Sequence, residues 1–461
     1  MRYLLGLLLI VALAAAGAFV YAGRLPGPAI EITKPVKYVG QSAPVEVAVT
    51  APGAKLTRLE VVFEQNGKQT PIASLAQPAS AEIKQDGPDK VRVTRTISRE
   101  QIPDLKTGPA KIIVTAERPV LRGMRKVQST ASHDVQVRLE KPMIAVISTK
   151  HYINLGGSEM VVYRATPPDV ESGVQVGDLL YPGYPAGGVK IEGVHIADPA
   201  VKLAFIALRY DQDVNTPMFA YAKDEAGNSA RADFDRLTFP KPFKKSRIEL
   251  NDAFLDRVVP AILATTTEVA PQGANLDKFL VLNGELRRKN AETIANYSKQ
   301  SSPEMLWNGV VFHPFTNSAV EAAFADQRTY VYGGKDVDRQ THLGFDLARV
   351  VNSPVVAANR GKVVHASPLG IYGNCVIIDH GMGVQSLYGH LSSFAVKVGD
   401  SVEKEQELGK SGMTGLAGGD HLHFTMLVNG QMVNPVEWWD SHWIEDRILR
   451  KLRAAGAPTA Q

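Results

Sequence analysis

Cysteine is almost absent from this chain, whose 461 residues include one, Cys375. A single thiol forms no disulfide within the chain and excludes a zinc cluster built on several cysteines. An excess of one charge is also lacking, because 51 lysines and arginines stand against 47 acidic residues. The resulting net charge of +4 is too small for a chain of this length to indicate nucleic-acid binding. The apolar share of 44% excludes disorder, and the length suits roughly three domains.

The N-terminus carries the long apolar run of the sequence, over residues 4–22, with Arg2 before it and Arg24 behind it. A basic residue followed by an apolar stretch that ends in small residues is typical of an export signal. At about 19 residues, the run also reaches the lower limit for a membrane span. We therefore expect residues 1–24 to be a signal peptide or an uncleaved signal anchor, the alternative being a buried core helix.

Apolar and polar residues alternate in short runs between residues 28 and 240, as at 45–49 and 91–94. This period of two, bounded by turns rich in glycine, proline and aspartate, predicts half-buried β-strands. We predict two immunoglobulin-like β-sandwich modules, over residues 28–140 and 141–240.

The pattern changes after Pro240. Asn251 and Asp252 are suited to begin a helix, and residues 276–297 form a second helical stretch with one polar side. We predict a helical connector over residues 241–323, which packs beside the next domain or over its cleft. Apolar and polar residues alternate again over residues 324–440, which predicts further β-strands. Residues 441–461 are expected to form a C-terminal helix and tail. The whole chain is thus predicted to be mainly β.

Histidines gather near the C-terminus, where seven of the eleven lie in the last 120 residues. His342 and Asp346 are four residues apart, a spacing that lets them converge on either a strand or a helix. His421 and His423 alternate along a predicted strand, and His390 follows another. Two imidazoles and a carboxylate are the ligand set of a hydrolytic zinc site, whereas magnesium and calcium prefer more oxygen ligands. The sequence lacks His-Glu-x-x-His, which excludes the helical zinc proteases that use it.

A series of ordered motifs over residues 341–435 resembles the lysostaphin-like zinc endopeptidases of bacterial cell-wall peptidoglycan, also called LytM-type or duplicated-hybrid-motif proteins. The matching stretches are HLGFD at 342–346, PVVA at 354–357, GKV at 361–363, YGN at 372–374, VIIDHG at 376–381, YGHL at 388–391, VGD at 398–400, GMTG at 412–415, HLHF at 421–424 and NP at 434–435. The resemblance implies an all-β zinc peptidase domain over residues 324–440.

The same resemblance assigns roles to the five residues. It makes His342, Asp346 and His423 the ligands of one Zn²⁺ per chain. His390 and His421 become the catalytic pair that hydrogen-bonds the attacking water or the oxyanion, and either of them can be the general base.

Three further positions bear on the substrate. Asn374 is a weaker candidate for contact with the substrate, since the same residue also suits a turn. Asp420 and Thr425, on either side of His421 and His423, differ from the residue types that the family usually has at these positions. These departures concern loop shape or substrate preference, because neither residue is among the ligands.

The resemblance implies an enzyme that hydrolyses peptide crosslinks of peptidoglycan during cell-wall remodelling. We expect it in the cell envelope, periplasmic and anchored in the inner membrane by the N-terminal segment if that segment is not cleaved. A periplasmic location favours crosslinks from D-alanine to diaminopimelate as the substrate over glycine bridges. Expected partners are peptidoglycan stem peptides and a regulatory envelope protein bound by the immunoglobulin-like modules, with no nucleic acid.

Two alternatives accompany this expectation. A non-catalytic module that binds peptidoglycan or activates an amidase is the competing function, although such modules typically lack one or more of the ligands. Within the enzyme hypothesis, the connector over residues 248–302 is expected to cover the cleft and hold the enzyme back.

Overall fold

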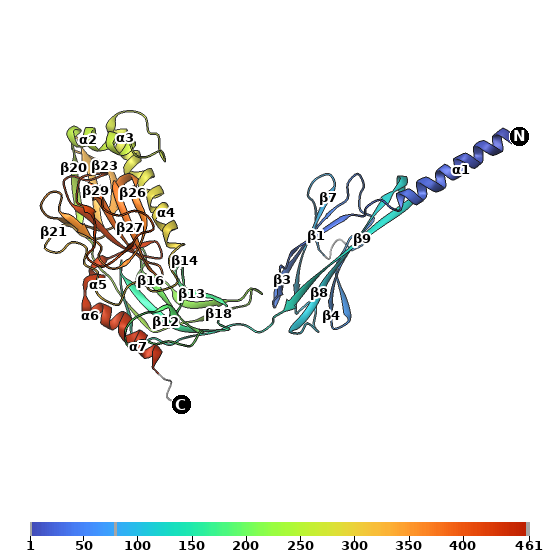
Figure 1. The fold of residues 1–461 in the computed structure, drawn as a ribbon, viewed down its shortest axis with the longest axis horizontal. Helices are drawn as coiled ribbons and strands as arrows, with labels where there is room; N and C mark the ends of the chain where they lie inside the picture. The colour runs from blue at the N-terminus through green and yellow to red at the C-terminus, as the bar shows by residue number, and fades with distance from the viewer. Residues whose placement is uncertain (1, 78–80, 458–461) are drawn as a thin grey trace. The chain divides into compact units, whose positions relative to one another are not determined.

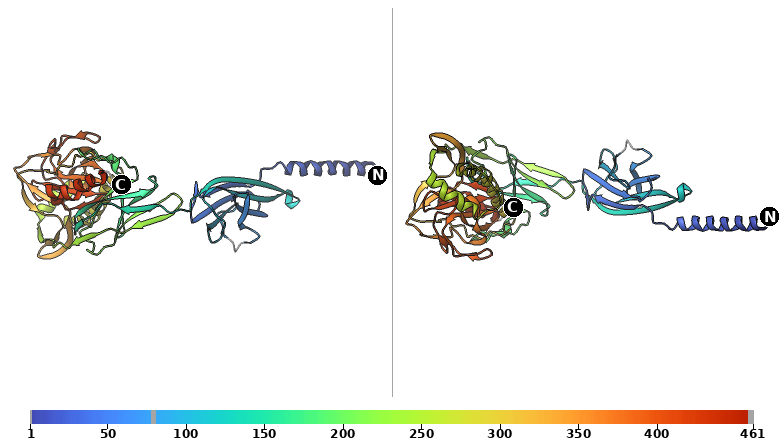
Figure 2. Two further views of the ribbon diagram at one scale, coloured as in Figure 1. Left: turned by 90° about the horizontal axis from the view of Figure 1, so that it is seen from below. Right: turned by 90° about the horizontal axis from the view of Figure 1, so that it is seen from above.

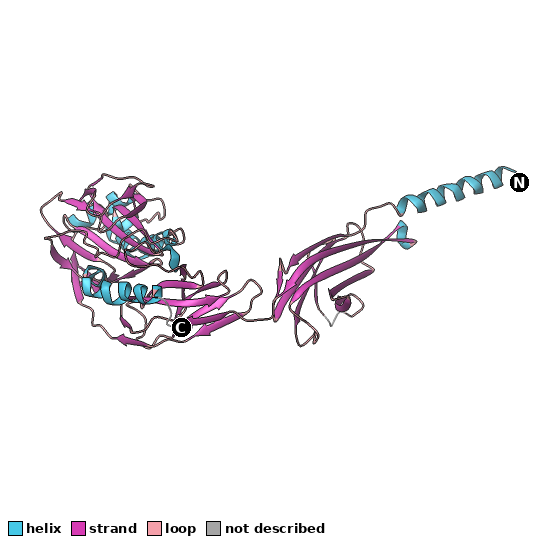
Figure 3. Ribbon diagram, turned by 60° about the horizontal axis from the view of Figure 1, so that its bottom comes forward, coloured by secondary structure: helices cyan, strands magenta, loops and turns pink. Residues whose placement is uncertain are grey.

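The computed structural model describes residues 2–77 and 81–457. Strands dominate the ribbon, which confirms the mainly β prediction (Figure 3). The chain divides into two compact units. The first comprises Met1–Pro142 with Lys223–Ala230, and the second comprises Met143–Ala222 with Arg231–Gln461.

Helix α1 (Arg2–Ala22) is apolar along its length. The stretch Tyr3–Ala22 has a mean hydropathy of 2.5, and its side chains are exposed except for that of Ala22. Its end packs on the first unit, where Ala22 contacts Val120 and Val127, and the rest of the helix runs free of the strands (Figure 2). The helix is long and apolar enough to cross a membrane, a test that a signal sequence also passes.

The strands of the first unit form two sheets, in the orders β1-β3-β7-β6 and β2-β9-β8-β4-β5. Their alternating side chains meet in one core, in which Val47, Phe63 and Ile112 are almost fully buried. The strands are β1 (Ala29–Lys34), β2 (Tyr38–Val39), β3 (Ser42–Thr50), β4 (Arg58–Gln65), β5 (Lys68–Ser74), β6 (Glu82–Gln85), β7 (Lys90–Ser98), β8 (Gly108–Val120) and β9 (Arg125–Val137). That this module is immunoglobulin-like stays a prediction.

The second unit begins with another set of short strands, in the sheets β10-β12-β16-β15, β14-β13-β17-β18 and β11-β19. Strand β16 is buried at every residue because it packs on both faces, one of them against the C-terminal part, where Phe205 meets Trp438. The strands are β10 (Met143–Val146), β11 (His151–Asn154), β12 (Ser158–Thr166), β13 (Glu171–Val176), β14 (Leu179–Pro182), β15 (Tyr184–Pro185), β16 (Val201–Ala207), β17 (Met218–Lys223), β18 (Ser229–Ala232) and β19 (Arg236–Phe239).

The connector is helical in its middle and has a strand at each end. Helix α2 (Asp252–Leu263) begins as predicted, because Asn251 Oδ1 accepts a hydrogen bond from the Phe254 amide at 2.9 Å. Helix α3 (Asn275–Val281), the π-helical segment η4 (Leu282–Leu286) and helix α4 (Arg287–Ser298) follow without a break. The segment predicted as a helical connector also contains β20 (Lys245–Leu250) and β21 (Ala319–Ala322), two strands that the sequence analysis did not predict and that each pair with a strand of the next domain.

The C-terminal domain is built on an eight-stranded sheet with the order β21-β24-β32-β28-β27-β26-β30, to which β33 adds beside β32. Two three-stranded sheets, β20-β22-β23 and β25-β31-β29, complete it. The strands are β22 (Asp326–Tyr332), β23 (Lys335–His342), β24 (Phe345–Ala348), β25 (Pro354–Val356), β26 (Gly361–Pro368), β27 (Asn374–Gly381), β28 (Val384–Leu391), β29 (Ser393–Phe394), β30 (Ser401–Val402), β31 (Glu407–Lys410), β32 (Leu422–Val428) and β33 (Gln431–Val433).

The chain ends in helical segments that tie this domain to the β-strands before the connector (Figure 1). Glu437 accepts a hydrogen bond from the Ser158 amide at 2.8 Å, and the ring of Trp438 contacts the tilted ring of Trp443, with centroids 5.2 Å apart, in the shared core. Packing is therefore the role of these tryptophans. The segments are α5 (Pro435–Trp439), α6 (Ser441–Ile444), the π-helical η6 (Glu445–Leu449) and α7 (Arg450–Gly456).

Candidate active site

The predicted ligands meet where three strands end or cross. His342 is the last residue of β23 and Asp346 lies in β24, so a corner between strands, and not one continuous strand or helix, brings them together. Asp346 and His423 are direct partners across the β24–β32 pairing, which puts both side chains on one face. The corner needs Gly344, because a Cβ there would lie 2.5 Å from His423 Nε2.

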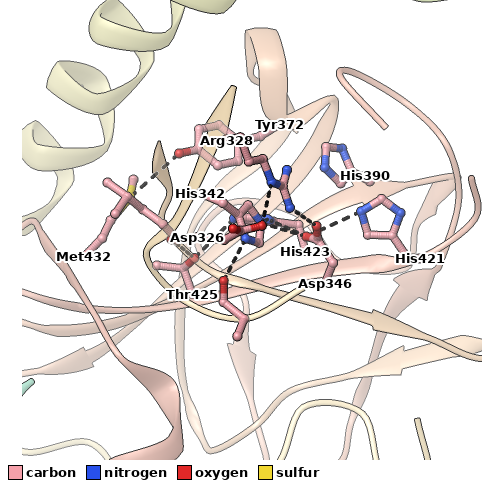
Figure 4. A network of polar contacts seen from close by, with 12 residues as sticks. Asp326, Arg328, His342, Asp346, Tyr372, His390, His421, His423, Thr425 and Met432 are labelled. Atoms are coloured by element: carbon pink, nitrogen blue, oxygen red, sulfur yellow. Dashed lines mark hydrogen bonds and ion pairs between the residues drawn. The ribbon is translucent and has the colours of Figure 1, made fainter. Parts of the chain in front are cut away.

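The ligand atoms of these residues converge, as Figure 4 shows. His342 Nε2 lies 2.9 Å from Asp346 Oδ1 and 3.1 Å from His423 Nδ1, and His423 Nδ1 lies 3.0 Å from Asp346 Oδ1. All three side chains are buried, with exposed fractions of 5 to 8%. The three residues form a group whose ligand atoms lie within 4.8 Å of one another, close enough to hold one metal ion.

The ring protons of the two histidines point away from this convergence. His342 Nδ1 contacts the Ala323 carbonyl at 3.2 Å, so it carries the proton and leaves Nε2 bare. The Thr425 hydroxyl donates to the Leu343 carbonyl at 2.6 Å, so it accepts from His423 Nε2 at 3.2 Å and leaves Nδ1 bare. Three buried electron-pair donors thus face one another, an arrangement that a cation stabilises and that fits a metal ion.

Asp346 stays ionised in this setting. Burial by itself would raise the pKa of Asp346, but any proton that the imidazoles of His342, His421 and His423 direct toward the carboxylate holds that pKa well below its ordinary value. Arg328 adds a positive charge on the other oxygen, with Nη2 3.0 Å from Asp346 Oδ2. The carboxylate therefore keeps one oxygen on the guanidinium and the other toward the histidines.

His390 and His421 lie side by side at one edge of the cluster, with ring centroids 4.8 Å apart (Figure 4). His390 has a φ of 64°, a left-handed conformation at an irregularity in the β27–β28 pairing that turns its ring toward the site. Its Nδ1 donates to the Thr414 carbonyl at 2.7 Å, and His421 Nδ1 donates to the Gly419 carbonyl at 2.9 Å. His390 therefore keeps its Nε2 free for the pocket, whereas His421 Nε2 faces Asp346 Oδ1 at 3.5 Å.

The two imidazoles differ in their tendency to bind a proton. Burial keeps the pKa of His390 well below its ordinary value, so the ring is neutral. Burial opposes charging of His421 as well, but the hydrogen bond and the charge of Asp346, whose Oδ1 lies 3.5 Å from His421 Nε2, outweigh it and raise its pKa. One neutral and one readily protonated imidazole thus stand together.

The four histidines and Asp346 line one pocket of about 100 Å³. The connector contributes to its wall, since Arg287 of α4 is among the lining residues. Arg257 of α2 donates to the Ala417 carbonyl at 2.9 Å, on the loop that leads to His421. The connector thus packs over the rim of the site. Of the two arrangements expected from the sequence, beside the domain or over its cleft, this is the second.

The remaining sequence candidates lie elsewhere. Asn374 begins β27 outside the lining of the pocket, and its backbone amide donates to Thr414 Oγ1 at 2.9 Å. His380 is fully buried at the β27–β28 hairpin, where Nδ1 donates to the Arg360 carbonyl at 2.8 Å. The thiol of Cys375 is buried in the same strand. The contact of Asn374 with substrate stays a prediction.

Two arginines of the site were missed in the sequence. Arg328 precedes the recognised motifs, and the signal for it was its spacing of two from Asp326, which places both on one face of β22. Asp326 is in turn the register partner of His342. Arg287 carried no signal, because its place depends on how α4 packs on the domain.

A β-domain whose buried histidines and aspartate form a metal-ligand set at the floor of a pocket defines the class of metal-dependent hydrolases. Comparison with known proteins specifies the class: residues 340–435 match the model of Peptidase family M23. The C-terminal domain of the chain is an M23 peptidase domain of the LytM and lysostaphin type.

Named relatives share this domain. DD-carboxypeptidase/endopeptidase Mpg of Neisseria meningitidis is 42% identical over 95 residues, 21% of this chain and 22% of that protein. Peptidoglycan DD-endopeptidase ShyA of Vibrio cholerae is 38% identical over 96 residues, again 21% and 22% of the two chains. The catalytic domain of lysostaphin from Staphylococcus simulans aligns at 31% identity over 26% of this chain and 90% of that chain, with a TM-score of 0.23. The matches thus span about a fifth of the length of the two relatives.

Proposed function

We propose that the chain is a zinc-dependent endopeptidase of the cell envelope that hydrolyses peptide crosslinks of peptidoglycan. The observation that carries the proposal is the convergence of His342 Nε2, Asp346 Oδ1 and His423 Nδ1 with the ring protons directed elsewhere. The sequence similarity to proteins named as DD-endopeptidases supports the peptide crosslink as substrate.

The ligand set favours zinc over magnesium or calcium, because two of its three donors are imidazole nitrogens. A zinc ion held there supplies Lewis-acid polarisation of the scissile carbonyl and activation of water near neutral pH. Because Asp346 is the one anion of the set, a zinc ion held by it would retain a net positive charge, which would favour a developing oxyanion.

The two neighbouring histidines supply the proton transfers in this proposal. Neutral His390 presents an unprotonated Nε2, as a general base needs. His421, whose pKa Asp346 raises, is suited to donate a hydrogen bond to the oxyanion or a proton to the leaving amine. We assign the base role to His390 and the donor role to His421.

The proposal places the enzyme outside the cytoplasmic membrane. Helix α1 is apolar and unburied, which suits either a membrane anchor or a cleaved signal. The strands before the connector are then available for a regulatory partner, and Asn374 for substrate contact beside the pocket. Sequencing the N-terminus of the exported protein distinguishes the anchor from the signal.

Digestion of purified sacculi in a zymogram tests the proposed function. The wild type is expected to lyse the sacculi, and His423→Ala and chelator-treated protein are expected to be inactive. His442→Ala is a matched control, because His442 is an exposed histidine of the same chain away from the site. Lysis that survives both treatments contradicts zinc hydrolysis, and absence of lysis by every form favours the activator module.

A further inference from the structure

Arg287 and Arg328 line the pocket, and Arg257 lies at its rim. Arg328 is bound to the carboxylate of Asp346, and Arg257 is bound to the Ala417 carbonyl on the rim. Like Arg257, Arg287 has no carboxylate paired with it among the residues that the structure describes, but unlike Arg257 it lines the pocket itself. A partly buried cation that lines a catalytic pocket without an acidic partner is an unused binding group.

The guanidinium of Arg287 is held in place by backbone and amide oxygens. Its Nε donates to the Asn283 carbonyl at 3.0 Å, and its Nη2 donates to Asn283 Oδ1 at 2.6 Å. Asn283 is itself fixed, because its Nδ2 donates to Asp338 Oδ2 at 2.8 Å on the strand β23 that carries His342. The remaining N–H groups of Arg287 are therefore presented at a set orientation, and Nη1 is free of any described partner.

The helix that carries Arg287 is a permanent wall of the pocket. Leu286 and Ile294, on either side of Arg287, are fully buried in the core shared with the peptidase domain. Asn290 Oδ1 accepts from the Ile371 amide at 3.0 Å, in the turn that also lines the pocket. Moving α4 away would expose this core, so Arg287 stays at the site when the rim opens.

We propose that Arg287 binds a free carboxylate of the substrate on the carbon bonded to the scissile nitrogen. The inference rests on the proposed function and specifies its substrate. In a crosslink from D-alanine to diaminopimelate that carbon bears a carboxylate, whereas the amide nitrogens within a glycine bridge are bonded to carbons without one. Arg287 thus makes the pocket selective for the first type of crosslink.

The surroundings strengthen such a contact. Hydrogen bonds from a guanidinium to a carboxylate are charge-assisted, and partial burial reduces their screening by water. Removing one is expected to weaken binding about 10- to 100-fold. The pocket of about 100 Å³ has room for a carboxylate, which displaces only a few water molecules of roughly 30 Å³ each.

Two synthetic crosslinked peptides test the proposal, one with that carboxylate free and one with it amidated. The full zinc-loaded chain is expected to hydrolyse the free form with a KM about 10- to 100-fold lower than the amide. Arg287→Gln is expected to raise the KM of the free form to that of the amide, with kcat little changed. Arg288→Gln is the matched control, because Arg288 is the adjacent, exposed arginine of the same helix.

Calorimetric binding of both peptides to the metal-depleted chain gives a readout that does not depend on catalysis. A preference for the free carboxylate that disappears in Arg287→Gln and persists in Arg288→Gln supports the proposal. Equal affinity for both peptides, binding of neither, or a preference that survives Arg287→Gln overturns it. An Arg287→Gln chain that hydrolyses both peptides faster also overturns it, since Arg287 then only obstructs the pocket. Binding preference without hydrolysis by any form contradicts the proposed function and leaves the carboxylate site standing.

Discussion

Replacing Thr425 by valine removes a hydroxyl that selects the ring form of His423 while keeping the volume of the side chain. In the native structure this hydroxyl accepts from His423 Nε2 at 3.2 Å, which leaves Nδ1 free to bind metal. Both residues are inaccessible or nearly so, with exposed fractions of 0% for Thr425 and 5% for His423. Water therefore does not replace the lost partner.

The magnitude follows from the proton that is left without an acceptor. An unsatisfied buried N–H costs about 1 to 3 kcal/mol, and the alternative ring form avoids that cost only by placing a proton on the ligand atom. The metal-free variant adopts that alternative form, and zinc binding must then reverse it and leave the Nε2 proton without an acceptor, which corresponds to roughly a 10- to 100-fold loss of affinity. Thr425→Ser, which keeps the hydroxyl, is expected to recover most of it.

Competition with a chromophoric chelator measures the zinc affinity of the three proteins. Thr216→Val is a control for the loss of a hydroxyl hydrogen bond in the same unit, since Thr216 Oγ1 donates to the Asp213 carbonyl away from the site. An affinity of Thr425→Val within about twofold of the wild type would refute the reasoning, because the hydroxyl would then have no part in holding His423.

Three other predictions concern stability and access. Burial lowers the pKa of His151 from 6.5 to about 4, so the unfolded chain binds more protons between these values, and the free energy of unfolding falls by about 3 kcal/mol as pH drops from 6.5 to 4. In urea unfolding, the free energy of unfolding of His151→Gln is expected to depend less on pH between 6.5 and 4 than that of the wild type. The same pH dependence in both proteins contradicts this. Fully buried Glu159 lies 2.7 Å from Lys451 Nζ. Lys451→Met leaves this carboxylate without its partner and is expected to lower the free energy of unfolding by about 3 to 5 kcal/mol in the same assay. Adding Glu159→Gln is expected to recover most of that loss. Arg257→Ala frees the rim loop at Ala417 and is expected to speed crosslink hydrolysis if the connector restrains the site; slower hydrolysis argues against restraint.

The sequence predicted the ligand cluster because its signals are local. Alternation at the start of β32 places His423 and the residue just before the strand, His421, on one side, and the ordered motifs around them identify Asp346 and His342. What the local pattern did not convey is the turn of His390, whose positive φ depends on an irregular pairing of β27 with β28. Such a conformation is imposed by the sheet and not by the residue.

Long-range pairing accounts for the missed elements. In the sequence, β20 is a basic segment that follows two prolines and gives no sign of a strand. It forms a strand because β22, far along the chain, pairs with it in parallel. Arg328 acquires its role through the same sheet, in which Asp326 lies opposite His342. Pairings of this kind follow from the completed fold and leave little trace in the local text.

The connector has two different relations to the pocket, and they predict opposite effects. At α2, Arg257 holds the rim by hydrogen bonds to the carbonyls of buried Ala417 and exposed Gly418, two contacts whose loss costs little. At α4, Leu286 and Ile294 belong to the core, so a chain shortened to begin near residue 310 would lose part of its wall along with β20. Point variants avoid that loss. If the connector both restrains and recognises, Arg257→Ala raises hydrolysis of every crosslink, whereas Arg287→Gln lowers hydrolysis of the carboxylate-bearing one alone.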